Sequence, residues 1–176
     1  ALWRAETSMY PHLFDDIAAD YGIDADIERL VAVFNDHEPT LEPYEGVPAL
    51  LDRLQAAGYA LGVVTDGTAH RQRRKLDALG LRPAFETVVL TADLGEAKPS
   101  PRPFAVAARR LDLPTECCLY VGDNPWVDFT GARAVGMATI RHRRGEFRSL
   151  SVDSGVDATA ETVEDIYEIV RDWADE

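Results

Sequence analysis

One stretch decides the fold of this chain: Tyr120-Val121-Gly122-Asp123-Asn124-Pro125-Trp126-Val127-Asp128. Its first residues end an apolar run that is typical of a buried strand, and a helical pattern begins at Val127. Asp123 and Asp128 therefore lie at one strand-to-helix turn, and two carboxylates there form an oxygen-rich site suited to Mg²⁺. Taken alone, the pair is equally compatible with Asp123 capping the helix and Asp128 facing solvent.

Strands and helices alternate on both sides of this stretch, which predicts an α/β fold with a parallel sheet and right-handed crossovers. Ligands in such folds bind outside the carboxyl ends of the strands, so the residues that follow each strand are the candidates for chemistry. The predicted strands are Tyr59–Thr65, Phe85–Leu90, Cys117–Val121 and Met137–Arg141, and the predicted helices are Val47–Ala57, His70–Leu79, Pro101–Leu111, Val127–Val135 and Glu161–Asp172.

The N-terminal part of the chain has a different rhythm. Apolar residues recur at helical spacing over Ser8–Asp20 and again over Asp24–Asn35, and two prolines then break the pattern between 37 and 43. We therefore expect a small helical unit over residues 1–40 and an α/β core over residues 41–176.

Composition limits the partners of the protein. The 176 residues carry a formal charge of −13, which repels nucleic acid and anionic membranes. No apolar run has the length of a membrane span and no secretory signal is visible, so a cytoplasmic protein is expected. The acidic, lysine-poor composition is also typical of a high-salt cytoplasm, which we hold as a hypothesis. Cys117 and Cys118 are expected on a strand as small buried hydrophobes, with no disulfide or zinc site.

Two further groups of polar residues follow predicted strands. Thr65, Asp66 and Gly67 come directly after the first strand, where a hydroxyl and two backbone N–H groups could hold phosphoryl oxygens. Lys98 lies in a loop after the second strand, and in a chain with two lysines it is a candidate for neutralising a phosphoryl oxygen. An ordinary turn and an ordinary surface lysine are the competing interpretations.

The order of these groups resembles the haloacid dehalogenase superfamily, in the subfamily with a small helical cap. The resemblance rests on Val63-Val64-Thr65-Asp66-Gly67, on Lys98-Pro99-Ser100-Pro101, and on Val121-Gly122-Asp123-Asn124 through Asp128. It implies a Rossmann-like core with an N-terminal helical cap and a Mg²⁺-dependent phosphatase acting on a small phosphorylated metabolite. It also implies phosphoryl binding by Thr65, Asp66, Gly67 and Lys98, with Asp123 and Asp128 as the metal ligands.

One motif of that family is absent from the sequence. The family's first strand is central in the sheet and ends in Asp-x-Asp-x-Thr, whose first aspartate is the nucleophile, and no such stretch precedes the helical unit. We therefore expect an N-terminally truncated form of a longer phosphatase, inactive by itself; a mis-assigned gene start and a degenerate protein are the other accounts. Asp15 and Asp16 lie in a helical pattern and do not replace the motif.

Two other functions stay open. A 2-haloacid dehalogenase from the same superfamily would need no metal, and a non-catalytic binding module would bind Mg²⁺ or a phosphorylated metabolite without turnover. The substrate and the oligomeric state cannot be predicted. Within the helical unit, four residues are weak candidates for anion contacts: Arg4, His12, Arg29 and His37.

Overall fold

The computed structural model describes residues 13–36, 40–151 and 155–174. Within these ranges no helix combines the length and the apolar character needed to cross a lipid bilayer. The helices are α1 (Leu13–Tyr21), α2 (Ile27–Asp36), α3 (Val47–Ala56), α4 (Ala69–Ala78), α5 (Thr91–Leu94), α6 (Arg102–Arg110), α7 (Phe129–Ala134) and α8 (Val163–Ala174), with 3₁₀ turns η2 (Arg82–Ala84), η3 (Thr115–Cys117) and η4 (Gly145–Phe147). The strands are β1 (Gly62–Thr65), β2 (Thr87–Leu90), β3 (Leu119–Gly122), β4 (Ala138–His142) and β5 (Ala158–Ala160).

The strands form two parallel sheets. In the first sheet β1 pairs with β2, and Thr65 lies opposite Leu90 at the carboxyl end. In the second sheet the order is β3-β4-β5, and Gly122 lies opposite Arg141. The prediction of an α/β fold with parallel strands is confirmed, and both sheets end at the loops that carry the candidate site residues.

A gap separates the two sheets. No described strand pairs with the inner edge of β1 or of β3, and an apolar cavity of about 420 Å³ lies between them. Residues of both strands line it, Val63 and Val64 on one side and Leu119 and Val121 on the other. The gap thus lies between β1 and β3, the position that the family resemblance gives to its first strand.

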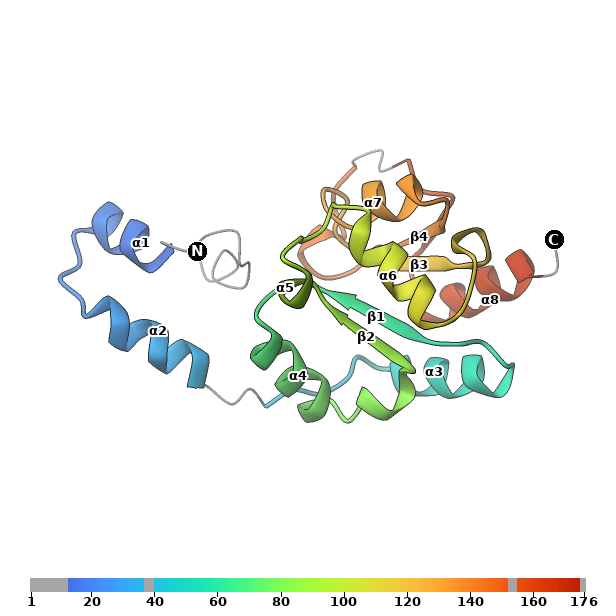
Figure 1. Cartoon of the computed structure of the whole chain (residues 1–176), viewed down its shortest axis with the longest axis horizontal. Helices are drawn as coiled ribbons and strands as arrows, with labels where there is room; N and C mark the ends of the chain where they lie inside the picture. The colour runs from blue at the N-terminus through green and yellow to red at the C-terminus, as the bar shows by residue number, and fades with distance from the viewer. Residues whose placement is uncertain (1–12, 37–39, 152–154, 175–176) are drawn as a thin grey trace.

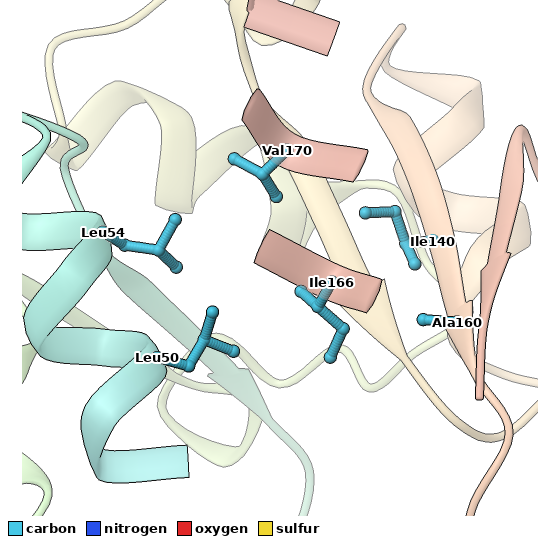
Figure 2. Close-up of a cluster of buried hydrophobic side chains, with 6 residues drawn as sticks. All are labelled: Leu50, Leu54, Ile140, Ala160, Ile166 and Val170. Atoms are coloured by element: carbon cyan, nitrogen blue, oxygen red, sulfur yellow. The ribbon is translucent and has the colours of Figure 1, made fainter. Parts of the chain in front are cut away.

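Helices cover both faces of this gap. The helix α6 packs against β1, β2 and α7 on one face, and α3 packs against α8 on the other (Figure 1). In Figure 2, Leu50 and Leu54 of α3 lie opposite Ile166 and Val170 of α8. These apolar contacts hold the two sheets together in the absence of backbone hydrogen bonds between β1 and β3.

The N-terminal helices α1 and α2 lie to one side of the core (Figure 1). Phe14 and Phe34 pack edge to face between them, and the guanidinium of Arg71 in α4 lies 3.9 Å from the Phe34 ring. Leu30 and Val31 on α2 are exposed to 41% and 38%, so part of the apolar stripe predicted for this helix faces solvent. The two predicted helices are confirmed within the described residues, and the role of the unit as a cap stays a prediction.

Several predictions for the N-terminal unit fall on residues that the structure does not describe. These are Ser8 to His12 of the first helix and the candidate anion contacts Arg4, His12 and His37. Arg29 is described and exposed, and its backbone amide donates to Asp26 Oδ1 at 3.0 Å.

The placement of the two cysteines on a strand, as buried residues, was wrong, because β3 begins only at Leu119. Cys117 belongs to η3 and is exposed, while Cys118 is half-buried just before β3. The backbone amides of Cys117 and Cys118 donate to the carbonyls of Pro114 and Thr115, so the chain turns before it extends. The proline opens a tight turn in place of the first strand residues.

Candidate active site

A buried ion pair lies at the centre of the candidate site. Lys98 Nζ is 2.7 Å from Asp128 Oδ1 and 3.9 Å from Asp66 Oδ2. The side chains of Lys98 and Asp128 are exposed to only 12% and 4%. Three segments far apart in the sequence therefore meet at the carboxyl ends of β1 and β3, as the sequence predicts for a parallel sheet.

Asp128 also holds the turn that follows β3. Its Oδ2 atom accepts hydrogen bonds from the backbone amides of Asp123 at 3.0 Å and Asn124 at 2.8 Å, and its Oδ1 atom accepts one from Tyr120 Oη at 3.3 Å. A Cβ atom on Gly122 would lie 2.7 Å from Asp128 Oδ2, so only glycine allows this approach. Asp128 is thus an acceptor for the lysine, a tyrosine and two backbone groups at once.

The loop that carries Lys98 is fixed from two sides. The Lys98 amide donates to Asp66 Oδ1 at 3.1 Å, which ties the loop to the end of β1. On the other side, a Cβ atom on Gly131 would collide with the carbonyl oxygens of Pro99 and Ser100, so α7 approaches the loop closely because it has no side chain there. These contacts bring Lys98 to Asp128.

Thr65 and Gly67 flank Asp66 without joining its contact to Lys98. The hydroxyl of Thr65 donates to Gln72 Oε1 at 3.1 Å, and it is half-buried at the end of β1. Gly67 has a φ of 111°, a backbone conformation that L side chains rarely adopt. Phosphoryl binding by Thr65, Asp66 and Gly67 stays a prediction, in a turn whose backbone geometry requires glycine.

The electrostatic environment of the ion pair keeps Lys98 charged. Burial by itself lowers the pKa of Lys98, but the oxygens of Tyr120, Asp128 and Asp66 outweigh it, and the net pKa is raised. Burial raises the pKa of the Tyr120 hydroxyl, so Tyr120 is a neutral donor at ordinary pH. A permanently charged ammonium group is what the binding of a phosphoryl oxygen requires.

The negative charge of Asp123 is less well neutralised than that of Asp128. Its pKa is raised by burial and by the neighbouring Asp128 carboxylate, and Arg144 and Lys98 oppose the shift. Among the described residues, ion pairs join Lys98 to Asp66 and Asp128, but none reaches Asp123. A cation beside Asp123 would relieve this excess of negative charge.

The fit to a metal ion depends mainly on Asp123. Over the described ranges, no group of three or more His, Cys, Asp or Glu side chains is arranged to hold a metal by itself. Mg²⁺ commonly binds through one or two carboxylates, with waters and substrate phosphate completing its shell. Asp123 fits that pattern as a direct ligand, whereas the oxygens of Asp128 are already engaged by Lys98 and two backbone amides.

Sequence reasoning missed Tyr120 and Arg144. Tyr120 opens the stretch that ends at Asp128, and its strand position alone gives no role to its hydroxyl, although a buried tyrosine hydroxyl usually has a hydrogen-bond partner. Arg144 follows β4, and its charge acts on Asp123 across the ends of two neighbouring strands. The proximity of Arg144 to Asp123 follows only from the register of β3 and β4, which cannot be predicted from the sequence.

Comparisons with known proteins agree with this geometry. Residues 8–142 match the family model described as "Haloacid dehalogenase-like hydrolase". Over 174 residues the chain is 34% identical to the glyceraldehyde 3-phosphate phosphatase of Methanopyrus kandleri, covering 95% of this chain and 75% of the relative. Over 102 residues it is 35% identical to the phosphoserine phosphatase of Thermus thermophilus, covering 58% of this chain and 41% of the relative.

A solved structure is also similar. The HAD phosphatase from Thermococcus onnurineus matches with a TM-score of 0.67 and 28% sequence identity, over 89% of this chain and 69% of that one. The region matched by the family model contains every candidate site residue from Thr65 to Asp128.

Proposed function

Because this chain belongs to the haloacid dehalogenase-like hydrolase family, we propose that its site serves the Mg²⁺-dependent hydrolysis of a phosphomonoester on a small phosphorylated metabolite. The observation that carries the proposal is the buried contact of Lys98 with Asp128 at the carboxyl ends of β1 and β3. A buried, charged lysine that a carboxylate holds at a strand end is suited to stabilising the negative charge of a phosphoryl group during its transfer.

Each part of the site has a place in this chemistry. Lys98 and the Thr65 hydroxyl would bind phosphoryl oxygens, together with the backbone N–H groups of Asp66 and Gly67. Asp123 would hold Mg²⁺, which when bound neutralises charge on the transferring group. Asp128 would act on the metal through water and fix the lysine, because its own oxygens already accept four hydrogen bonds.

The names of the relatives support a small substrate. The two relatives described above are named for the hydrolysis of glyceraldehyde 3-phosphate and of phosphoserine, and both of these compounds are three-carbon phosphomonoesters. The chain covers 75% of the first relative and 41% of the second.

We further propose that the 176 residues alone do not turn over substrate, because the sequence contains no Asp-x-Asp-x-Thr strand to supply the nucleophile. The purified chain should bind inorganic phosphate in the presence of Mg²⁺ and should release no product from p-nitrophenyl phosphate. Asp123→Asn should weaken the Mg²⁺-dependent part of phosphate binding at least about tenfold, since it removes the metal carboxylate. Calorimetric titration and a colorimetric assay measure the two effects.

The matched control is Asp77→Asn, which changes an exposed aspartate of α4 away from the site. It should leave phosphate binding as in the unmodified chain. Mg²⁺-dependent hydrolysis that disappears in Asp123→Asn would show that the chain has its own nucleophile. Phosphate binding that is independent of both Mg²⁺ and Asp123 would contradict the metal assignment.

A further inference from the structure

One arginine beside the site has no protein anion to bind. Arg144 follows β4 by two residues and is half-buried. Over the part of the chain that the structure describes, it takes part in no ion pair and no hydrogen bond of its side chain. In a chain with 31 acidic residues, a half-buried guanidinium without a carboxylate partner is unusual.

The neighbouring arginines show the contrast. Arg141 donates to the carbonyl oxygens of Phe147 and Leu150 at 3.1 and 3.0 Å. Arg143 pairs with Glu161 at 3.2 Å and donates to the carbonyl of Arg148. The protein itself therefore provides partners for Arg141 of β4 and for Arg143 of the following loop, and Arg144 is left with N–H groups to offer.

An aromatic ring fixes the position of Arg144. Its guanidinium carbon lies 3.2 Å from the centroid of the Tyr44 ring, and Tyr44 itself is 64% exposed. A guanidinium stacked on a ring keeps its N–H edge free and loses little further freedom when it binds a planar anion. The stack is thus a prepared anion-binding group.

The register of the strands places this group next to the phosphoryl site. Gly122 at the end of β3 lies opposite Arg141 at the end of β4, so Asp123 and the residues after His142 extend from the same edge of the sheet. Trp126, which is 54% exposed, packs edge to face on Phe147 of the same loop at 5.7 Å.

We propose that Arg144, held against the Tyr44 ring, binds a carboxylate on the phosphorylated metabolite whose phosphoryl group is held at Lys98. A guanidinium donates two parallel hydrogen bonds to a carboxylate, which fixes the orientation of the ligand as well as its charge. The inference rests on the proposed function. It adds that the site prefers a phosphomonoester that also carries a carboxylate over one whose other end is uncharged.

Three probes separate phosphoryl binding at Lys98 from carboxylate binding at Arg144. They are inorganic phosphate, glycerol 3-phosphate and 2-phosphoglycolate, each titrated calorimetrically into the 176-residue chain with Mg²⁺. Phosphoglycolate should bind about tenfold or more tightly than glycerol 3-phosphate, since one charge-assisted bidentate contact is worth at least that factor. In Arg144→Gln this ratio should fall to near one, while phosphate should still bind.

Three further variants test the choice of arginine and the stacking on Tyr44. Arg148→Gln removes an exposed arginine of the same loop and should keep the ratio. Tyr44→Phe keeps the ring and should also keep it, whereas Tyr44→Leu should lower it toward that of Arg144→Gln. A ratio unchanged in Arg144→Gln, with phosphate still bound, overturns the carboxylate site and leaves the proposed function standing. No binding of any of the three probes overturns both.

Discussion

At the scale of single residues, Asp123 and Asp128 have different roles, although both follow β3 and lie five residues apart. Asp128 is 3% exposed and accepts hydrogen bonds from Lys98 and from the amides of Asp123 and Asn124. Asp123 forms no ion pair among the described residues, and burial disfavours its charge. Asp128 therefore stabilises the fold of the site, and Asp123 is available for a ligand.

Asp128→Asn should therefore reduce the free energy of unfolding by about 3 kcal/mol, because it leaves the buried Lys98 ammonium without its closest carboxylate. Asp123→Asn should change it by less than about 0.5 kcal/mol, and it serves as the matched control. Chemical denaturation at neutral pH measures both values. Equal losses in the two variants would contradict the division of roles.

Much of this residue-level arrangement could be predicted, and some could not. The meeting of Lys98 with Asp128 follows from the rule that parallel strands end at one edge, and the structure has it at 2.7 Å. The use of the Asp66 carboxylate to hold the Lys98 backbone could not be predicted, because a side chain that can hold a ligand can equally hold a loop. The stack of Arg144 on Tyr44 joins residues one hundred positions apart, and local patterns carry no information about it.

At the scale of elements, the sequence indicated four strands and missed the fifth. Ala158–Ala160 has three residues and two alanines, so neither length nor composition marks it as a strand. Its position depends on Asp157, whose Oδ2 atom accepts hydrogen bonds from the amide and the hydroxyl of Thr139 at 2.8 and 2.7 Å. A tertiary contact to β4 thus determines a strand that local preference does not.

The pH dependence of stability should report this contact. The hydrogen bonds from Thr139 hold the pKa of Asp157 below its usual value. A lowered native pKa means that the stabilisation is complete above the unfolded pKa of about 4 and is lost as the pH falls through the native value. Asp157→Asn should lower the free energy of unfolding by only about 1 kcal/mol at pH 7, since the group is largely exposed. The loss should be smaller at pH 3, where the carboxylate of the unmodified chain contributes less.

Urea denaturation at pH 7, 5 and 3 measures this difference. Thr159→Val changes β5 on its exposed side without touching Asp157, and it should retain the pH dependence of the unmodified chain. A constant cost of Asp157→Asn from pH 7 to pH 3 would mean that the carboxylate charge does not contribute to the contact.

At the scale of the whole molecule, the cavity between the sheets makes the core unusual. A close-packed interior loses stability when an alanine is enlarged, typically by 1–3 kcal/mol. Ala107 of α6 is buried but lines the apolar cavity of about 420 Å³. Ala132 of α7 is fully buried and does not line it. The same substitution should therefore have opposite effects at these two positions.

Ala107→Leu should raise the free energy of unfolding by about 1 kcal/mol, because the added methyl groups fill apolar space. Ala132→Leu should lower it by about 2 kcal/mol through overpacking. Thermal and urea denaturation of both variants measure the pair. Destabilisation by both to the same extent would show that the two sheets close over the cavity in solution.

The Lys98–Asp128 contact has a mechanical consequence for the whole chain. Lys98 follows the first sheet and Asp128 follows the second. The candidate site is therefore also a clasp between two halves whose described strands do not pair with each other. The packing of α3 on α8 combines apolar contacts (Figure 2) with an ion pair between Arg53 and Glu164 at 2.6 Å, whose side chains are largely exposed. Apolar contacts weaken on cooling, whereas a buried ion pair is only weakly screened by salt. In the cold, the halves would separate first along their apolar seam, with the clasp as the pivot.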